Sequence, residues 1–205
     1  VTMFAAILMM GEPGTEIMYP DPGFPIYRSM AGYSGARAVP YALHEEMGFS
    51  FKAEDILARV NDNTRLIILN SPGNPTGGSN VEAEVEVLAR GLESFPNCAV
   101  LSDEIYSRLY FDGESHLSLL QFEALRERLI VLDGWSKTYA MTGWRLGWGI
   151  WPISMIGAAT KLAINIHSCV NAPAQAAALA ALEGPQDDVE TMRMAFQARR
   201  DFIHA

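Results

Sequence analysis

The stretch Leu66-Ile67-Ile68-Leu69-Asn70-Ser71-Pro72-Gly73 joins an unbroken apolar run to a polar turn. Four consecutive apolar residues ahead of Pro and Gly are typical of a short strand that is buried on both faces. Similar runs recur along the chain, at 15–19, 38–41, 99–101, 129–132 and 146–151. Segments with helical spacing lie between them. We therefore predict an α/β fold of three layers (αβα), in which helices cover both faces of a mostly parallel sheet.

The predicted helices separate the strands and also form both ends of the chain. Apolar residues three or four apart predict helices at 53–60 and 81–92, and residues from Pro152 onward are mostly helical and rich in Ala. Residues 1–10 predict a helix without an N-cap, and residues 187–205 predict one without a stop signal. We therefore expect the chain to be a piece of a longer protein.

Composition excludes several classes of protein. The chain has 205 residues, of which 49% are hydrophobic and 19% are charged, and these values are typical of a folded domain. Its 15 Lys and Arg against 24 Asp and Glu give a net charge of −9 with no basic block, so we expect no nucleic-acid partner. No apolar run approaches the ~18–20 residues of a membrane span. Cys98 and Cys169 are too few for a disulfide scaffold or a metal site, and we expect free, buried thiols in a reducing compartment.

Chemically capable side chains follow the predicted strands. In an open α/β sheet, ligands bind beyond the carboxyl ends of the strands. The three positions that follow central strands carry Asn74, then Asp103 with Tyr106, then Ser136 with Lys137. Arg145 comes eight residues after Lys137. The convergence of these groups at one edge is a stronger signal than any single loop.

Each of these side chains suits one chemical task. A desolvated Lys137 amine would be a nucleophile able to form a Schiff base with a carbonyl, and Arg145 suits a phosphate. A buried Asp103 needs a cationic partner, such as a protonated ring nitrogen. Alone, each has a simpler explanation: a surface lysine, a helix N-cap for Asp103 and a turn residue for Asn74. Together they match the aldehyde, ring nitrogen, phenolic oxygen and phosphate of pyridoxal 5′-phosphate (PLP).

Three motifs carry a resemblance to a known family. They are Asn70-Ser71-Pro72-Gly73-Asn74-Pro75-Thr76-Gly77, Ser102-Asp103-Glu104-Ile105-Tyr106 and Ser136-Lys137-Thr138-Tyr139-Ala140-Met141-Thr142-Gly143-Trp144-Arg145-Leu146-Gly147. In their order and spacing the sequence resembles the PLP-dependent aminotransferases of class I/II, the aspartate aminotransferase superfamily of fold type I. The match extends over nearly the whole chain. It implies that residues 1–205 are the central part of the large PLP-binding domain, incomplete, with 186–205 a helix that leads toward a missing small domain.

The resemblance also implies a role for each matching residue. Lys137 would be catalytic, forming the Schiff base and moving the proton from the substrate Cα. Asp103 would pair with the pyridinium nitrogen. Tyr106 and Asn74 would hydrogen-bond the phenolic oxygen, and Asn74 would lie near the substrate carboxylate. The phosphate would be held by Arg145 and Ser136.

In the segment that precedes the second predicted strand, Phe24 matches the aromatic residue that stacks on the pyridine ring, and a place in the plain core is its alternative. The same resemblance predicts a cis peptide bond between Asn74 and Pro75. It implies no metal.

The chain departs from the family pattern at the phosphate site. The family usually has a small hydroxyl residue three positions before the lysine, and here that residue is Gly134. The family's phosphate loop, which would precede Val1, and the arginine that binds the substrate carboxylate have no counterpart in these residues. The isolated chain is therefore expected to be inactive.

The implied function is transfer of an amino group from an L-amino acid to a 2-oxo acid, in a cytoplasmic homodimer of amino-acid metabolism. Two alternatives stay open: another fold type I reaction, such as that of a C–S lyase, decarboxylase or synthase, and a non-enzymatic PLP-binding regulator domain. Among the histidines, we expect His44, His116 and His204 at the surface.

Overall fold

The computed structural model describes residues 1–205 and contains one six-stranded sheet, with the strand order β2-β1-β3-β4-β5-β6. The first five strands run parallel and β6 pairs antiparallel with β5. The strands are β1 (Glu16–Asp21), β2 (Arg37–Ala42), β3 (Thr64–Asn70), β4 (Ala99–Asp103), β5 (Leu129–Asp133) and β6 (Trp148–Ile150). The mostly parallel sheet predicted from the apolar runs is confirmed.

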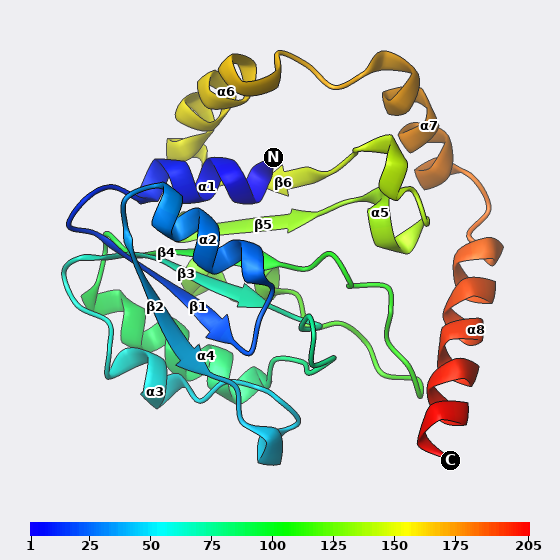
Figure 1. Ribbon diagram of the computed structural model, residues 1–205, viewed down its shortest axis with the longest axis horizontal. Coiled ribbons are helices and arrows are strands. Elements are labelled where there is room, and N and C mark those ends of the chain that lie inside the picture. The colour runs from blue at the N-terminus through cyan, green and yellow to red at the C-terminus, as the bar shows by residue number, and fades with distance from the viewer.

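Helices cover both faces of this sheet (Figure 1). The α-helices are α1 (Thr2–Met10), α2 (Pro25–Tyr33), α3 (Ala53–Leu57), α4 (Glu82–Gly91), α5 (Trp135–Thr138), α6 (Ile153–His167), α7 (Ala172–Glu183) and α8 (Asp187–His204). Short 3₁₀ helices span Glu45–Met47, Leu92–Ser94, Leu119–Gln121, Glu123–Arg128 and Thr142–Trp144. None of these helices combines the length and the hydropathy needed to cross a bilayer.

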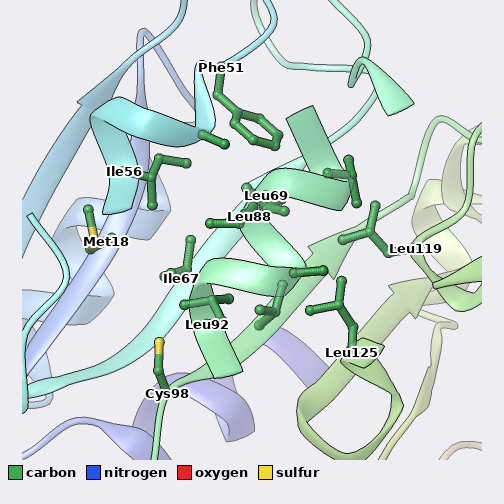
Figure 2. Packing of buried hydrophobic residues seen from close by; sticks show 14 of the residues in the cluster. Met18, Phe51, Ile56, Ile67, Leu69, Leu88, Leu92, Cys98, Leu119 and Leu125 are labelled. Carbon is green, nitrogen blue, oxygen red and sulfur yellow. The ribbon is translucent and has the colours of Figure 1, made fainter. Parts of the chain in front are cut away.

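The alternation of side chains along β3 explains the three layers. Ile67 and Leu69 belong to a cluster of 19 buried residues on the face covered by α3 and α4 (Figure 2). Leu66 and Ile68 point the other way, into a cluster of 12 buried residues with α1 and α2. Successive strand residues point to opposite faces, so a strand that is covered on both sides must be apolar throughout.

Two predicted elements are shorter in the structure than in the sequence pattern. The helix expected at 53–60 ends at Leu57, and residues 58–60 continue only as a turn. The strand expected at 146–151 is reduced to Trp148–Ile150. Leu146 is buried, but it packs with α7 residues Ala174 and Ala178 rather than in the sheet. Trp148 and Ile150 are exposed at 38% and 43%, so apolar character at 146–151 marked neither the strand boundaries nor the buried residues.

The last three helices are packed much more lightly than the first four. The only buried side chains of α6, α7 and α8 are Ala159, Ala174, Ala178 and Val189. Figure 1 shows these helices following one another around the rim of the sheet, with α8 farthest from the strands.

The two cysteines differ from each other. Both are free; Cys98 is buried at the start of β4, while Cys169 is exposed between α6 and α7. The expectation of two buried thiols is therefore wrong for Cys169.

Candidate active site

The residues at the carboxyl ends of β3, β4 and β5 lie side by side. The parallel register pairs Asn70 with Asp103, and Asp103 with Leu132. Asp133 ends β5 and is followed by the short helix α5, which carries Lys137. The sheet thus brings the polar groups of three loops to one edge, as predicted from the strand endings.

Asp103 is the buried carboxylate of this edge, with 7% of its surface exposed. Its Oδ2 accepts a hydrogen bond of 2.6 Å from the Tyr27 hydroxyl, and its Oδ1 accepts one of 3.3 Å from the Ile105 backbone N–H. Burial raises the pKa of Asp103 to about 6, although both hydrogen bonds act to lower it. No Lys or Arg side chain forms an ion pair with it, so the carboxylate has its donors but lacks a cation.

Tyr27 is a site residue that the sequence interpretation missed. It lies on α2 with 1% of its surface exposed, and burial, followed by the charge of Asp103, raises the pKa of its hydroxyl. Its ring packs edge-on against Phe24, with centroids 5.7 Å apart. Phe24 is the N-cap of α2, and Tyr27 follows it by three residues, a spacing that places two side chains on the same side of a helical turn. This three-residue spacing from Phe24 was the feature of the sequence from which Tyr27 could have been predicted.

Asn70 connects the loop after β3 to Asp103. Its side-chain amide donates to the Asp103 carbonyl at 3.0 Å, while its Oδ1 accepts from the Asn74 backbone N–H at 2.9 Å. The Asn74–Pro75 peptide bond is cis, as predicted, and so are Ser71–Pro72 and Asp21–Pro22. The Asn74 side chain is half-buried and makes no hydrogen bond within the chain, so its amide is free to bind another group.

Tyr106 and Lys137 come from different loops and meet at this edge. The Lys137 ammonium lies 5.7 Å from the centroid of the Tyr106 ring. Lys137 is exposed and forms no ion pair, so this chain does not provide the desolvation that we expected to activate the amine. Ser136, directly before it on α5, is half-buried.

Position 134 requires glycine because the backbone of residues 146 and 147 lies close to it. A Cβ at this position would lie 2.8 Å from the Leu146 carbonyl oxygen and 2.9 Å from the Gly147 Cα, too close for any side chain. The turn that precedes Lys137 is therefore pressed against the segment that follows Arg145. This contact gives a physical reason for the missing hydroxyl residue: position 134 has no room for one.

Arg145 lies at the same end of the sheet. Its backbone is left-handed, with φ of 57°, and its guanidinium is exposed, donating to the Thr142 carbonyl at 2.9 Å. An exposed guanidinium at this edge suits an anionic ligand such as a phosphate.

A cavity of about 620 Å³ opens beside Asn74 and Tyr106. Its walls are the loop after β3, the loop after β4 and the C-terminal half of α8, which contributes Phe196, Arg200 and His204. Asn74 and Tyr106 thus border a space of the size usual for small-molecule sites, whereas Asp103, Lys137 and Arg145 do not line it.

The sequence model of the aminotransferase class I and II family matches residues 2–205. The chain belongs to the class I and II aminotransferases. The arginine–pyruvate transaminase of Pseudomonas aeruginosa is 37% identical over 201 residues, which are 98% of this chain and 51% of that protein. The aspartate aminotransferase of Bacillus sp. strain YM-2 is 36% identical over 205 residues, which are 99% of this chain and 51% of that enzyme.

Solved aminotransferase structures share the fold. The aspartate aminotransferase from Rhizobium meliloti superimposes with a TM-score of 0.93 at 33% identity, over 98% of this chain and 50% of that one. The N-succinyldiaminopimelate aminotransferase from Mycobacterium tuberculosis gives 0.92 at 31% identity, over 99% of this chain and 53% of that one. The chain spans about half the length of these aminotransferases.

Proposed function

We propose that the protein is a PLP-dependent aminotransferase that moves an amino group from an L-amino acid to a 2-oxo acid. The observation that carries the proposal is the buried Asp103, which has hydrogen-bond donors but no cation, at the edge where Lys137 and Tyr106 meet. A buried carboxylate that lacks a cation is costly, and the ring nitrogen of PLP is the cation that this family binds.

The residues present fit that cofactor. When bound, PLP supplies an electrophilic aldehyde and a ring that draws electrons from the substrate. Asp103 would keep the ring nitrogen protonated, and the charge of that nitrogen would oppose the effect of burial on the pKa of Asp103, since an opposite charge favours the ionised carboxylate. Lys137 would carry the proton to and from the substrate Cα, because its amine is unpaired beside Tyr106.

The remaining groups would hold the cofactor in place. The Tyr106 phenol and the Asn74 amide, both on the wall of the cavity, suit the phenolic oxygen. Arg145 would bind the phosphate together with Ser136, which is half-buried on the turn of Lys137. Phe24 would cover the ring face, and its edge-on contact with Tyr27 would fix its position.

Replacing Lys137 by Ala in the full-length protein tests the proposal. We expect the variant to lose the visible absorption band of protein-bound PLP and the exchange of an amino group between an amino acid and a 2-oxo acid. Lys161→Ala is the matched control, because Lys161 is an exposed lysine on α6. Retention of the band in Lys137→Ala would remove Lys137 from its assigned role.

The products identify the reaction on this scaffold. An aminotransferase returns a 2-oxo acid and an aminated cofactor, whereas a decarboxylase releases CO₂ and a C–S lyase releases a thiol. Binding of PLP without turnover of any of these substrates would instead favour a regulator domain.

A second part of the proposal concerns which domain of the family's proteins this chain forms. We propose that residues 1–205 form the central part of the large domain and that 186–205 lead toward a small domain. The support is that α8 buries only Val189 and that the chain matches about half of each relative. Purification of the chain with and without its neighbouring segments, followed by limited proteolysis, tests this boundary.

We also propose a homodimer that acts in amino-acid metabolism in the cytoplasm. The homodimer is supported by exposed apolar side chains outside the sheet, including Trp144 at 50%, Ile153 at 88% and Ile164 at 57% exposure. Two unpaired cysteines are consistent with a reducing compartment. Light scattering during size-exclusion chromatography measures the mass, and cell fractionation locates the protein.

A further inference from the structure

Glu104 follows Asp103 directly but points to the opposite side of the strand. Its side chain is 5% exposed. Its Oε1 accepts hydrogen bonds of 2.8 Å from the Ser102 hydroxyl and 3.0 Å from the Leu119 backbone N–H, while its Oε2 is 2.7 Å from the His116 Nε2. A carboxylate buried this deeply is retained only where every lone pair has a partner.

His116 is the other half of this pair, and it is not at the surface as the sequence interpretation expected. Its side chain is 12% exposed. Both ring nitrogens have partners, since Nε2 contacts Glu104 and Nδ1 is 3.4 Å from the Tyr110 hydroxyl. His44 is also mostly covered, with 20% of its side chain exposed and a 2.7 Å contact to Asp55. Only His204 is exposed as expected.

The Glu104–His116 pair closes a loop that holds a predicted cofactor residue. Residues 105–115 lie between the two partners and contain no helix or strand. Tyr106 is in this loop, and the next residue, Ser107, donates a 2.9 Å hydrogen bond to Asp133 at the end of β5. A loop without secondary structure keeps its conformation only through such ties, so the placement of Tyr106 depends on them.

The same loop reaches α8. The Tyr110 carbonyl accepts from Arg193 at 3.1 Å, and Asp112 forms an ion pair with Arg200 at 2.6 Å. In Figure 1 the green loop that follows β4 extends across to α8, in agreement with these contacts. The Asp112–Arg200 pair is exposed, whereas the side chains of Glu104 and His116 are only 5% and 12% exposed, so the Glu104–His116 pair is the stronger restraint on the loop.

We propose that Glu104 and His116 are a positioning pair that closes residues 105–115 into one conformation and thereby holds the Tyr106 phenol beside Lys137. This inference rests on the proposed function, since it concerns the contact of Tyr106 with PLP. Neither residue touches the cofactor; both act through Tyr106.

His116→Phe removes the contact with Glu104, and His116→Gln keeps a donor that can reach it. We expect His116→Phe to bind PLP about ten-fold more weakly, the size of effect that follows from losing one hydrogen bond to a charged group. His116→Gln should restore most of that affinity. His44→Phe is the matched control, because it breaks a contact of equal length with Asp55, a residue at the beginning of α3.

Two readouts separate a positioning role from a general loss of stability. Amide hydrogen exchange of the cofactor-free protein should accelerate across residues 105–115 in His116→Phe but not in His44→Phe. The spectrum of bound PLP should shift in His116→Phe in the direction that Tyr106→Phe shifts it. The double variant should match Tyr106→Phe alone, since two changes that act through one contact are not additive.

The outcomes distinguish this inference from the function on which it rests. If the unaltered protein binds no PLP, the proposed function is overturned, and the role of the pair falls with it. If PLP binds and His116→Phe leaves affinity, spectrum and exchange unchanged, only the positioning role is overturned. Additive effects of His116→Phe and Tyr106→Phe would also overturn it.

Discussion

The carboxyl end of β4 and the helices α6–α8 are built in opposite ways. Every residue of β4 is buried, and the polar groups at its end are joined by hydrogen bonds to α2, β5 and the loop after β3. In contrast, α8 has 18 residues and buries only Val189, while its Phe202 is 84% and its Ile203 78% exposed.

This difference shows where the order of the proposed site originates. Asp103, Tyr27 and Asn70 are held by contacts within residues 1–133, so their geometry does not depend on the later helices. The apolar residues of α6–α8 have no such partners here, and apolar surface of that extent is typical of an interface. The chemistry and the assembly of the molecule can therefore be tested separately.

Among variants that keep Lys137, the largest effect is expected from Asp103→Asn. The amide cannot stabilise a protonated ring nitrogen, so we expect a loss of about 10²–10³-fold in amino-group transfer, the range seen when one preorganised electrostatic group is removed. The measurement is single-turnover conversion of an amino acid by the PLP-loaded full-length protein. Glu54→Gln, at an exposed acidic residue of α3, is the control.

The same variant should make the cofactor-free protein more stable. The pKa of Asp103 is raised from 3.8 to about 6 in the folded chain, so the folded state binds more protons than the unfolded state between these values. The free energy of unfolding contributed by Asp103 therefore falls as the pH rises through this window and stays low above pH 6, at about 1.4 kcal/mol per pKa unit. Urea unfolding at pH 5 and pH 8 should show a gain in Asp103→Asn that is about twice as large at pH 8 as at pH 5. An equal gain at both values would contradict this account.

The second prediction compares the sheet with the outer helices in stability. Ile68→Ala leaves a cavity in the fully buried centre of β3, and we expect it to lower the free energy of unfolding by about 3 kcal/mol. Leu179→Ala on α7, at a position that is 54% exposed, should change it by less than about 0.5 kcal/mol. Denaturant titration of both variants measures the difference. A large loss in Leu179→Ala would show that α7 is packed against something that stabilises the fold.

The sequence predicted the sheet and its polar edge well for a physical reason. Strands buried on both faces, such as Leu66–Leu69, must be apolar throughout, and the chain must turn at their ends. The position of each polar residue after a strand therefore follows from local sequence. Contacts between distant segments leave no such trace: the Tyr27 and Asp103 hydroxyl–carboxylate bond joins residues 76 positions apart, and the pairing of His116 with Glu104 depends on how a loop folds back.

The third prediction concerns the hydrogen bond between Tyr27 and Asp103. Tyr27→Phe removes the 2.6 Å hydrogen bond to Asp103, and because this bond lowers the pKa of the carboxyl, that pKa should rise further. We expect PLP binding to weaken about ten-fold near pH 7 and less at pH 9, where the carboxyl of the cofactor-free protein is ionised in either case. The pH profile of PLP binding measures this shift.

Tyr41→Phe is a close control for Tyr27→Phe. Tyr41 is also a fully buried tyrosine, and its hydroxyl donates a 2.7 Å hydrogen bond to the Ile68 carbonyl, away from the carboxylate. It should lower stability while leaving the pH profile in place. If both variants shift the profile equally, Tyr27 has no particular role toward Asp103.

The smallest effect on folding is expected from Phe202→Ser. This variant tests whether the helices α6–α8 are independent of the site at the end of β4. Phe202 contributes little to the packing of this chain because 84% of it is exposed, so the free energy of unfolding should change by less than about 0.5 kcal/mol. PLP binding should be unaffected, since α8 contributes no residue among those proposed to hold the cofactor. Any loss should appear instead in the mass measured by light scattering, if the exposed face of α8 is covered by a second copy. A Phe202→Ser protein with unchanged mass but weakened PLP binding would mean that α8 supports the site itself, and the separation between the two regions would then be wrong.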